Sequence, residues 1–316
     1  MKFKIFTYFS LFLILTISLV FVSNMYKQNN DIKDIYFDNA LKIQKEKEHN
    51  FNSYTQNIKK LLFLINQNKY FKDFVKNKNN EELVKNLFLN YSMLDDSIFQ
   101  LRYLDGNGQE IIRIDQERKN KVVEKKNLQN KKNRYYFDAI YKLNRNEIWL
   151  SNIDLNTEHG KIEIPYKPTL RIGLPVYVDE QKKGILIINL NVSRFLNVIK
   201  ENTFFWISII DGNENILITN KSKYDWSKYL NTGKKIYDVY PELKNKKNQL
   251  NIKKLDIKSS EELYLVFEAK EIDYVRILKE RTEEFNFILL YIFVGMLSIA
   301  YILAIFLDKK IKSIEL

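Results

Sequence analysis

The sequence predicts an α+β protein in which two antiparallel-sheet modules stand on one long N-terminal helix, flanked by two transmembrane helices. Three observations lead to this fold class. Uncharged apolar runs occupy residues 5–22 and 285–307, each long enough to cross a hydrocarbon core of ~30 Å as a helix. Residues 27–66 contain no Pro or Gly and repeat apolar residues at helical spacing. From residue 97 onward, the apolar pattern changes to the period of two that is typical of strands.

The residues that flank the two apolar runs predict the orientation of the chain. Lys2 and Lys4 precede the first run, and Lys309, Lys310 and Lys312 follow the second. Because short Lys-rich flanks mark the cytoplasmic side, we expect both termini inside the bacterial inner membrane and the middle outside. A cleaved signal peptide is the alternative for residues 1–23, although the run exceeds the usual ~7–15 residues and no A-x-A-like site follows.

Composition excludes several classes of function. The net charge is +12, but Lys is mixed with Asp, Glu and Asn and forms no long basic block, which argues against nucleic acid as a partner. The absence of cysteine excludes disulfides, Cys-ligated zinc and thiol catalysis. An exported domain without disulfides must therefore be held together by a packed core.

The long helix after the first run is predicted to be the spine of the outer domain. Its apolar residues recur three and four positions apart and form one stripe: Phe51, Tyr54, Ile58, Leu61 or Leu62, and Ile65. At ~1.5 Å per residue, the forty residues would extend roughly 60 Å. Such a spine is a candidate seam for a homodimer. A shorter helix is expected over residues 81–93.

A repeated hairpin predicts two related modules. Residues 97–104 and 110–115 alternate on either side of Asp105-Gly106-Asn107-Gly108, and residues 206–210 and 216–219 do so around Asp211-Gly212-Asn213. Asn and Gly tolerate the positive φ of tight turns, so both segments are hairpin signals. Matching turns with matching flanks indicate a duplication.

The remaining elements complete the predicted order. Strands are expected at residues 169–178 and 184–191, joined by a charged turn over residues 179–183, and at residues 262–268, before a helix that begins at residue 272 and enters the second apolar run. The predicted parts are a transmembrane helix (1–26), a spine helix (27–70), a membrane-distal module (71–197), a membrane-proximal module (198–271), a juxtamembrane helix (272–284), a second transmembrane helix (285–307) and a short cytoplasmic tail (308–316).

Several segments resemble bacterial double-Cache sensor domains. They are residues 99–114 around the first hairpin, residues 133–137 (Asn-Arg-Tyr-Tyr-Phe), residues 147–156, residues 173–176 and 183–187, and the later Trp226 with residues 240–242. The resemblance implies two PAS-like modules on a long helix, as in sensor histidine kinases, diguanylate cyclases and chemoreceptors. Two features depart from the family: the motif that clamps an amino acid is not cleanly present, and no output region follows the second apolar run.

The candidate ligand-binding residues are Arg134, Tyr136, Trp149, Asp154 and Arg171, which we expect around a pocket in the distal module. A guanidinium group suits a ligand carboxylate, and a carboxylate suits an ammonium or hydroxyl group. Aromatic side chains exclude water and can stack on a ring. The alternative is that Arg134 and Asp154 pair with each other while the aromatics belong to the core. For Arg102 and Arg113, an interior position and an exposed ion pair are both open; Trp206, Trp226 and Tyr240 are expected in the core of the proximal module.

The sequence contains no motif for hydrolysis or nucleotide chemistry, and its two histidines, His49 and His159, are far apart. We therefore expect neither enzyme activity nor a metal or cofactor. The leading hypothesis is a membrane-anchored extracytoplasmic sensory domain for transmembrane signalling. It would bind a small-molecule ligand or a periplasmic binding protein, form a homodimer and act on a cytoplasmic output protein in trans. The alternative is a non-signalling membrane-anchored binding or scaffold protein.

Overall fold

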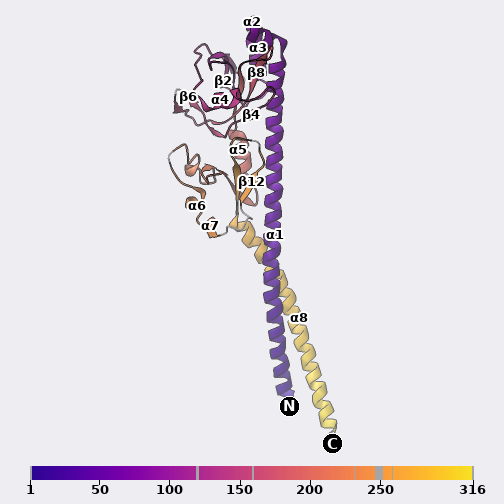
Figure 1. Cartoon of the computed structure of the whole chain (residues 1–316). Helices are drawn as coiled ribbons and strands as arrows, with labels where there is room; N and C mark the ends of the chain where they lie inside the picture. Colours follow the sequence, from indigo (N-terminus) through magenta and orange to yellow (C-terminus); the bar gives the residue numbers. More distant parts are fainter. Residues whose placement is uncertain are drawn as a thin grey trace. The chain divides into compact units, whose positions relative to one another are not determined.

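The computed structural model describes residues 2–118, 121–158, 160–230, 232–245, 252–257 and 259–314 (Figure 1). Residues Leu41–Glu268 form one compact unit, and the two ends of the chain form another. The long helix α1 (Lys2–Gln67) is uninterrupted because no Pro or Gly precedes its end. It stops where the Asn68 side chain caps the next helix, α2 (Lys69–Asn77), by accepting from the Tyr70 and Phe71 amides at 2.9 and 3.2 Å.

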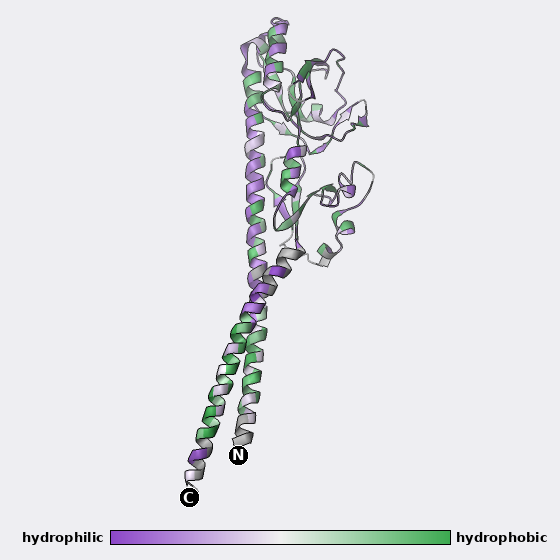
Figure 2. Cartoon of the chain, turned by 180° about the vertical axis from the view of Figure 1, so that it is seen from behind, coloured by the Kyte–Doolittle hydropathy of each residue, from purple (hydrophilic) through white to green (hydrophobic). Residues whose placement is uncertain are grey.

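The unit made from the two chain ends consists of the first part of α1 and the helix α8 (Glu271–Ile314). Each helix has a segment long and apolar enough to cross a membrane, by length and composition (Figure 2). The apolar side chains there are mostly exposed, including Phe12 and Tyr291, whereas Leu13, Ala300 and Ala304 are buried. A core helix of a soluble protein would bury most of these side chains.

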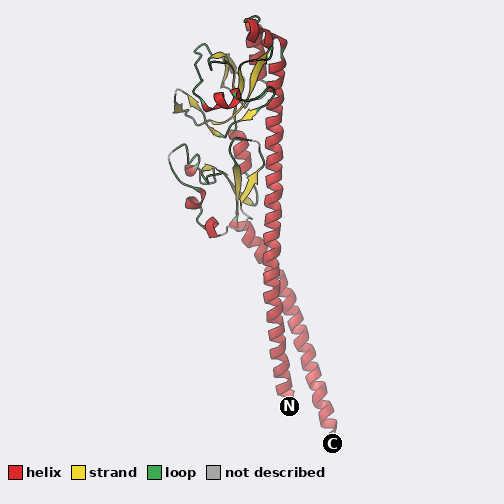
Figure 3. Cartoon of the chain, viewed as in Figure 1, coloured by secondary structure: helices red, strands yellow, loops and turns green. Residues whose placement is uncertain are grey.

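The compact unit contains two main sheets that are separate in sequence (Figure 3). The seven-stranded sheet has the order β3-β2-β1-β9-β8-β4, with β5 also paired to β8. The pairings between these strands are all antiparallel among the described residues. The bounds are β1 (Ile98–Asp105), β2 (Glu110–Arg118), β3 (Lys121–Glu124), β4 (Trp149–Leu150), β5 (Asp154–Leu155), β8 (Pro168–Val178) and β9 (Gln181–Asn191), and a short separate hairpin joins β6 (Thr157–Glu158) to β7 (Lys161–Ile162).

The two faces of the seven-stranded sheet differ in chemistry. Leu101 and Tyr103 of β1 point to one face, where the Tyr103 ring meets Phe71 edge-on at 5.3 Å between centroids. That face is apolar and covered by α2 and α3 (Glu81–Ser92). The opposite face carries α4 (Tyr135–Tyr141) over one half, where Gly173 leaves room for Ile140; a Cβ at this glycine would lie 2.4 Å from the isoleucine Cδ1.

The four-stranded sheet has the order β11-β10-β13-β12 and follows the linking helix α5 (Ser193–Lys200). Its strands are β10 (Phe205–Asp211), β11 (Ile216–Ile218), β12 (Ile252–Leu255) and β13 (Leu263–Ala269). The short helices η1 (Ser222–Tyr224), α6 (Ile236–Val239) and α7 (Glu242–Asn245) lie in the connection between β11 and β12. Side chains of α1 donate to this sheet's end, with Gln44 Nε2 at 2.7 Å from the Lys254 carbonyl and Asn52 Nδ2 at 3.2 Å from that of Asp256.

Two sequence-based expectations need correction. The turn predicted over residues 179–183 is only two residues long: Asp179 and Glu180, both at positive φ (47° and 62°), join β8 directly to β9. Residues 181–183 therefore belong to β9. Trp206 is not a core residue, because it is 44% exposed on β10, whereas Trp226 and Tyr240 are buried as expected. His159 lies outside the described residues.

Candidate functional site

The polar half of the second face of the seven-stranded sheet contains a cavity of about 10 Å³, roughly the space for one water molecule. It lies over β1, β9 and β8, and its outer wall comes from the start of α4 and the segment around β6. The side chains that line it are almost all polar: Gln100, Arg102, Lys131, Arg134, Tyr136, Asn156, Thr157, Glu158, Arg171 and Asn189.

Arg102 lies at the centre of the polar face and is 2% exposed. Its Nη1 is 3.2 Å from Glu110 Oε1 and donates to the Tyr136 hydroxyl at 3.1 Å, while its Nη2 donates to Asn189 Oδ1 at 3.0 Å. The carboxylate of Glu110 is also fully buried and accepts from the Gln129 amide at 3.0 Å. A buried charge requires such partners, because an unpaired one would be strongly destabilising.

Arg171 lies on β8 and is 1% exposed. Its Nη1 is 2.6 Å from Asp154 Oδ1 and 3.2 Å from the Tyr135 hydroxyl, which itself donates to Asp154 Oδ2 at 2.9 Å. Burial lowers the pKa of the Arg171 guanidinium, but the Asp154 carboxylate together with Tyr135 and Tyr136 outweighs burial and leaves the pKa above its usual value. Burial raises the pKa of the Tyr135 hydroxyl, so that group remains a protonated donor.

Two buried guanidinium nitrogens at this site have no hydrogen-bond acceptor: Arg102 Nε and Arg171 Nε. Both guanidinium groups also lie near the ring of Tyr136, with their central carbons 5.4 and 5.7 Å from its centroid. Buried donors are nearly always paired in native proteins. Two such donors in one polar cavity are therefore a sign that the cavity receives an acceptor.

A second layer of charges surrounds the cavity. Arg113 donates from Nε and Nη2 to Asp115 at 2.9 and 2.7 Å, and its Nη2 is 3.2 Å from Glu158. At the outer wall, Arg134 donates to Thr157 Oγ1 at 3.0 Å and Lys131 donates to Gln129 Oε1 at 2.7 Å. Among the described residues, no carboxylate oxygen lies within ion-pair distance of either of these two cations. The wall of the cavity is thus more cationic than anionic.

The five residues singled out from the sequence occupy different places. Arg134, Tyr136 and Arg171 line the cavity. Asp154 lies behind it and holds Arg171, so the pair that forms is Arg171–Asp154 and not Arg134–Asp154. Trp149 is outside the cavity: it packs at the edge of the apolar cluster under α4 and meets the Tyr135 ring at 5.9 Å.

Sequence reasoning did not place Gln100 and Asn189 at the site, and it left Arg102 open. All three are buried there, and the Asn189 amide donates to Gln100 Oε1 at 3.0 Å. Their signal is present in the sequence, because each is a polar residue at an alternate position of a strand whose other face is apolar. Arg113, the other residue left open, is 7% exposed and paired internally.

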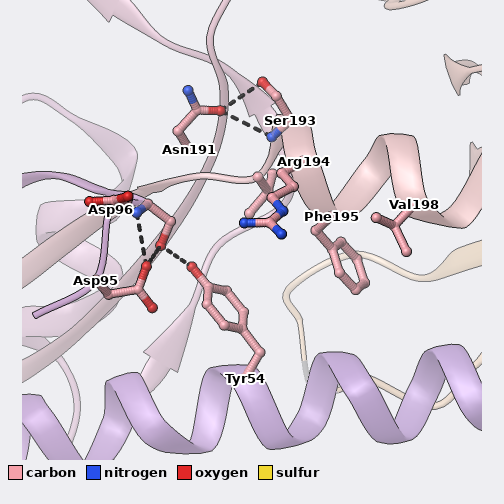
Figure 4. A pocket seen from close by; sticks show the side chains of 10 residues that line it. Tyr54, Asp95, Asp96, Asn191, Ser193, Arg194, Phe195 and Val198 are labelled. Carbon is pink, nitrogen blue, oxygen red and sulfur yellow. Dashed lines mark hydrogen bonds between the residues drawn. The ribbon is translucent and has the colours of Figure 1, made fainter. Parts of the chain in front are cut away.

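A second, larger hollow of about 560 Å³ lies where α1, the loop before β1 and α5 meet (Figure 4). Tyr54 of α1 faces Arg194, Phe195 and Val198 of α5 across it. Its acceptors have local partners, since Asp95 Oδ1 accepts from the Ser97 amide and hydroxyl at 2.8 and 2.6 Å. None of the buried polar atoms without a partner, among those described, belongs to a residue that lines it. The smaller cavity is therefore the stronger candidate.

Comparisons with known proteins identify the family and the fold. The family model for the bacterial histidine kinase sensor domain matches residues 38–252. The extracellular domain of vpHK1S-Z8, assigned as a histidine kinase, is 16% identical, with a TM-score of 0.67 over 78% of this chain and 95% of that chain. A domain of a sensory box/GGDEF family protein from Vibrio parahaemolyticus is 18% identical, with a TM-score of 0.67 over 77% and 99%.

A third solved structure is the ligand-binding domain of the Pseudomonas fluorescens chemoreceptor CtaA in complex with L-leucine. It is 10% identical, with a TM-score of 0.52 over 78% of this chain and 99% of that chain. At these identities the three structures show a shared fold. No curated protein matches the sequence.

Proposed function

This chain belongs to the bacterial histidine kinase sensor-domain family, and on that premise we propose that it is a membrane-anchored sensory domain that binds a small molecule in the cavity over the seven-stranded sheet. The observation that carries this proposal is the pair of buried Arg102 and Arg171 guanidinium groups, each with an unpartnered Nε. Two desolvated cations on one sheet face cost folding free energy, which is typical of a site retained for binding. The small-molecule complex of CtaA, which shares the fold, supports the same use.

Binding at this cavity requires its outer wall to move. The space holds about 10 Å³, so a ligand of several heavy atoms would separate Arg134 from Thr157 and shift the start of α4. The Arg134–Thr157 hydrogen bond would break, at a net cost of about 1 kcal/mol, and the contacts of Tyr135 with Asp154 and Arg171 would have to adjust. Such a movement is the first step of the proposed response.

A thermal-shift screen of the full chain in lipid nanodiscs tests the binding site. Arg134→Ala should abolish the shift produced by any ligand found, because it removes a cation from the cavity wall without removing core volume. Arg194→Ala is the matched control, because this exposed arginine borders the larger hollow. If Arg194→Ala abolishes the shift and Arg134→Ala does not, the hollow between α1 and α5 is the site instead.

The proposed topology places residues 1–26 and 285–307 across the inner membrane, with both termini in the cytoplasm. The exposed apolar side chains of α1 and α8 support this arrangement, as do the Lys-rich flanks. Alkaline phosphatase fused near Lys221 should be active, and the same enzyme fused after Leu316 should be inactive. The reverse pattern would contradict the sensory proposal.

We also propose that the seven- and four-stranded sheets belong to two PAS-like modules, over residues 71–197 and 198–271, and that the signal leaves through α8. β13 ends at Ala269 and α8 begins at Glu271, so sheet and helix are joined directly. A continuous helix transmits displacement without a hinge. Grafting residues 1–312 onto a reporter kinase and inserting Gly-Gly-Ser-Gly after Arg281 should remove the ligand response; an unchanged response would mean another route.

The proposed homodimer cannot use an apolar seam along the middle of α1. Between Leu41 and Lys60, every described exposed residue of this helix is polar, including His49 and Gln56. A parallel pair of such faces would bring like side chains together without burying apolar area. Dimerisation and coupling to a cytoplasmic output protein in trans therefore depend on other surfaces or on the apolar segments.

A further inference from the structure

We infer that the ligand is a small organic anion that carries no ammonium group, which rests on the proposed binding function and names its ligand class. Small-molecule sensing alone is compatible with zwitterions such as amino acids. The charges around this cavity are not compatible with a zwitterionic ligand. The reasons are the carboxylates that are already engaged, the cations that are not, and the position of the two central arginines.

The carboxylates around the cavity are engaged by the protein itself. Asp154 accepts from Arg171 at 2.6 Å and from Tyr135 at 2.9 Å. Glu110 accepts from Arg102 and from the Gln129 amide, and Glu158, the only carboxylate among the lining residues described, lies 3.2 Å from Arg113. An ammonium group entering the cavity would have to displace an arginine from its acid, which leaves a buried guanidinium unpaired.

Two cations around the cavity, unlike its carboxylates, are not paired with an opposite charge among the described residues. Arg134 and Lys131 line the cavity and bind only neutral oxygens, those of Thr157 and Gln129, among the described residues. Counting the second layer, five cations (Arg102, Arg113, Arg134, Arg171 and Lys131) accompany four carboxylates (Glu110, Asp115, Asp154 and Glu158). The excess is positive, so a ligand with a net negative charge completes the balance and a zwitterion does not.

The two central arginines are placed to hold one anionic group between them. Arg102 on β1 pairs in register with Ile187 of β9, and Arg171 on β8 pairs with Asn189 of β9, so the two arginines flank this strand from either side. Each guanidinium carbon lies within 5.7 Å of the Tyr136 ring centroid, so the two carbons are less than twice that distance apart. Each still has one free Nε donor. An oxyanion between them would satisfy both donors with charge-assisted hydrogen bonds.

The same ring argues against an ammonium group. Aromatic faces are a common alternative site for ammonium ions. Here the Tyr136 ring already has two guanidinium groups close to it, and its hydroxyl accepts from Arg102. A third cation at this ring would be repelled by both arginines.

Matched ligand pairs on the full chain in nanodiscs provide the first test. Within each pair the two acids differ in the ammonium group: succinate against L-aspartate, and 2-hydroxy-4-methylpentanoate against L-leucine. We expect the member without the ammonium to bind about tenfold more tightly or better in whichever pair binds, as for one lost charge-assisted contact. Equal or tighter binding of the amino acid in that pair would overturn the inference.

Substitution of Asp154 provides the second test, because the two ligand classes predict opposite signs. In Asp154→Asn the Arg171 charge loses its carboxylate, so the unliganded protein should melt at a lower temperature and an anionic ligand should produce a larger stabilising shift than in the wild type. If Asp154 held a ligand ammonium, Asp154→Asn would instead reduce the shift. Asp154→Glu keeps the charge and is the control. Should Asp154→Asn fail to fold, the ligand pairs decide the question on the wild type alone.

The outcomes separate this inference from the proposed function. A broad screen in which zwitterions or cations bind at the cavity, with binding lost in Arg134→Ala, would retain the sensory function and remove the anionic class. A screen in which amino acids bind and no organic anion binds would likewise retain the sensory function and contradict the anionic ligand class. A screen in which no small molecule shifts the wild-type melting temperature would contradict both the proposed binding function and the ligand class.

Discussion

The two hairpins of this protein have the same strand pairing and turn but carry different side chains. In the first, Tyr103 pairs with Ile112 and Leu104 with Glu110, with a register shift between them. In the second, Ile209 pairs with Ile218 and Ile210 with Ile216, with the shift at the same place. The turns also match, because Asp105 Oδ1 accepts from two amides at 2.9 Å, those of Asn107 and Gln109, and Asp211 Oδ1 does so from those of Asn213 and Asn215.

The side chains on these equivalent positions explain why only one hairpin carries a charged cavity. Arg102, Glu110 and Arg113 of the first hairpin correspond to Ser208, Ile216 and Thr219 of the second. Ser208 donates to Thr219 at 2.9 Å, and Thr219 shares a hydrogen bond with the Tyr240 hydroxyl, so this group is satisfied internally. The same hairpin backbone therefore carries a charged face with Arg, Glu and Arg at these positions, and a hydrogen-bonded, apolar face with Ser, Ile and Thr.

The strongest test of this comparison transfers the second hairpin's residues to the first. Glu110→Gln alone should destabilise the fold by about 3–5 kcal/mol, because it leaves the buried Arg102 without its acid. The triple variant R102S/E110I/R113T should be destabilised less and should lose ligand binding, since Arg102 and Glu110 leave together and the two carboxylates that lose Arg113 (Asp115 and Glu158) are less buried than Glu110. Urea unfolding and thermal-shift titration of the full chain in detergent measure both effects.

The order of the two stabilities decides the outcome. A triple variant less stable than Glu110→Gln would mean that the charged network contributes to the fold beyond its own pairing. The reverse transfer, placing Arg, Glu and Arg at positions 208, 216 and 219, is expected to unfold the four-stranded sheet, because Ile216 is buried in one apolar cluster with Ile236, Tyr240 and Val266.

A second test uses the turn position at which the hairpins differ, Gly108 against Glu214. Both residues have positive φ, 77° and 67°. A Cβ at Gly108 would lie 2.6 Å from the Lys132 backbone, so Gly108→Ala should destabilise by about 2–4 kcal/mol through backbone displacement. Glu214→Gly should change stability by less than about 1 kcal/mol, because Glu214 already tolerates this conformation. If Gly108→Ala and Glu214→Gly changed the free energy of unfolding in urea by the same amount, the close approach of Gly108 to the Lys132 backbone would be contradicted.

The hairpins, the strands around them and the long helix are predictable because each follows from local pattern: period, turn residues and the lack of Pro and Gly in α1. The cavity was only partly predictable. Arg134, Tyr136 and Arg171 line it, but Asp154 faces Arg171, because β5 pairs with β8 at Thr169 and the two side chains therefore meet across neighbouring strands. Trp149 lies apart because β4 is only two residues long and pairs at Gly173, beneath α4.

The long-range pairings explain the remaining gaps. Nothing local in the sequence shows that Arg102 and Arg171 flank one strand, since that depends on the order β1-β9-β8. The exposure of Trp206 is similar: position 206 corresponds to Gln100, but Trp206 lies near the start of β10, before the buried Ser208 and Ile210. A strand period alone does not reveal this exposure.

A third, smaller test compares the two turn aspartates. Each accepts two backbone amides, so Asp105→Ala and Asp211→Ala should each cost about 1–2 kcal/mol. Asp211 should cost more, because it is 2% exposed and its Oδ2 also accepts from Asn215 Nδ2 at 2.8 Å. Asn at either position is the control that keeps one acceptor. If Asp105→Ala lowered the free energy of unfolding more than Asp211→Ala, the turn at Asp105 would contribute more to stability than its exposure indicates.

The smallest expected effect is a difference in the response of the two sheets to acid. On β2, Lys121 and Lys125 hold the pKa of Glu117 at about 2, below its usual 4.5, so its contribution to stability is present above pH 4.5 and is lost as the pH falls toward 2.

Near β11, burial raises the pKa of Asp225 above its usual 3.8, although the Thr219 amide and Lys200 oppose the shift. The folded state therefore binds this proton more tightly, and stability decreases as the pH rises above 3.8. Consequently Glu117→Gln should lower the melting temperature slightly at pH 7 and not at pH 2, while Asp225→Asn should raise it at pH 7 and not at pH 3. Melting curves across this range would refute the assignment if both variants shifted in the same direction.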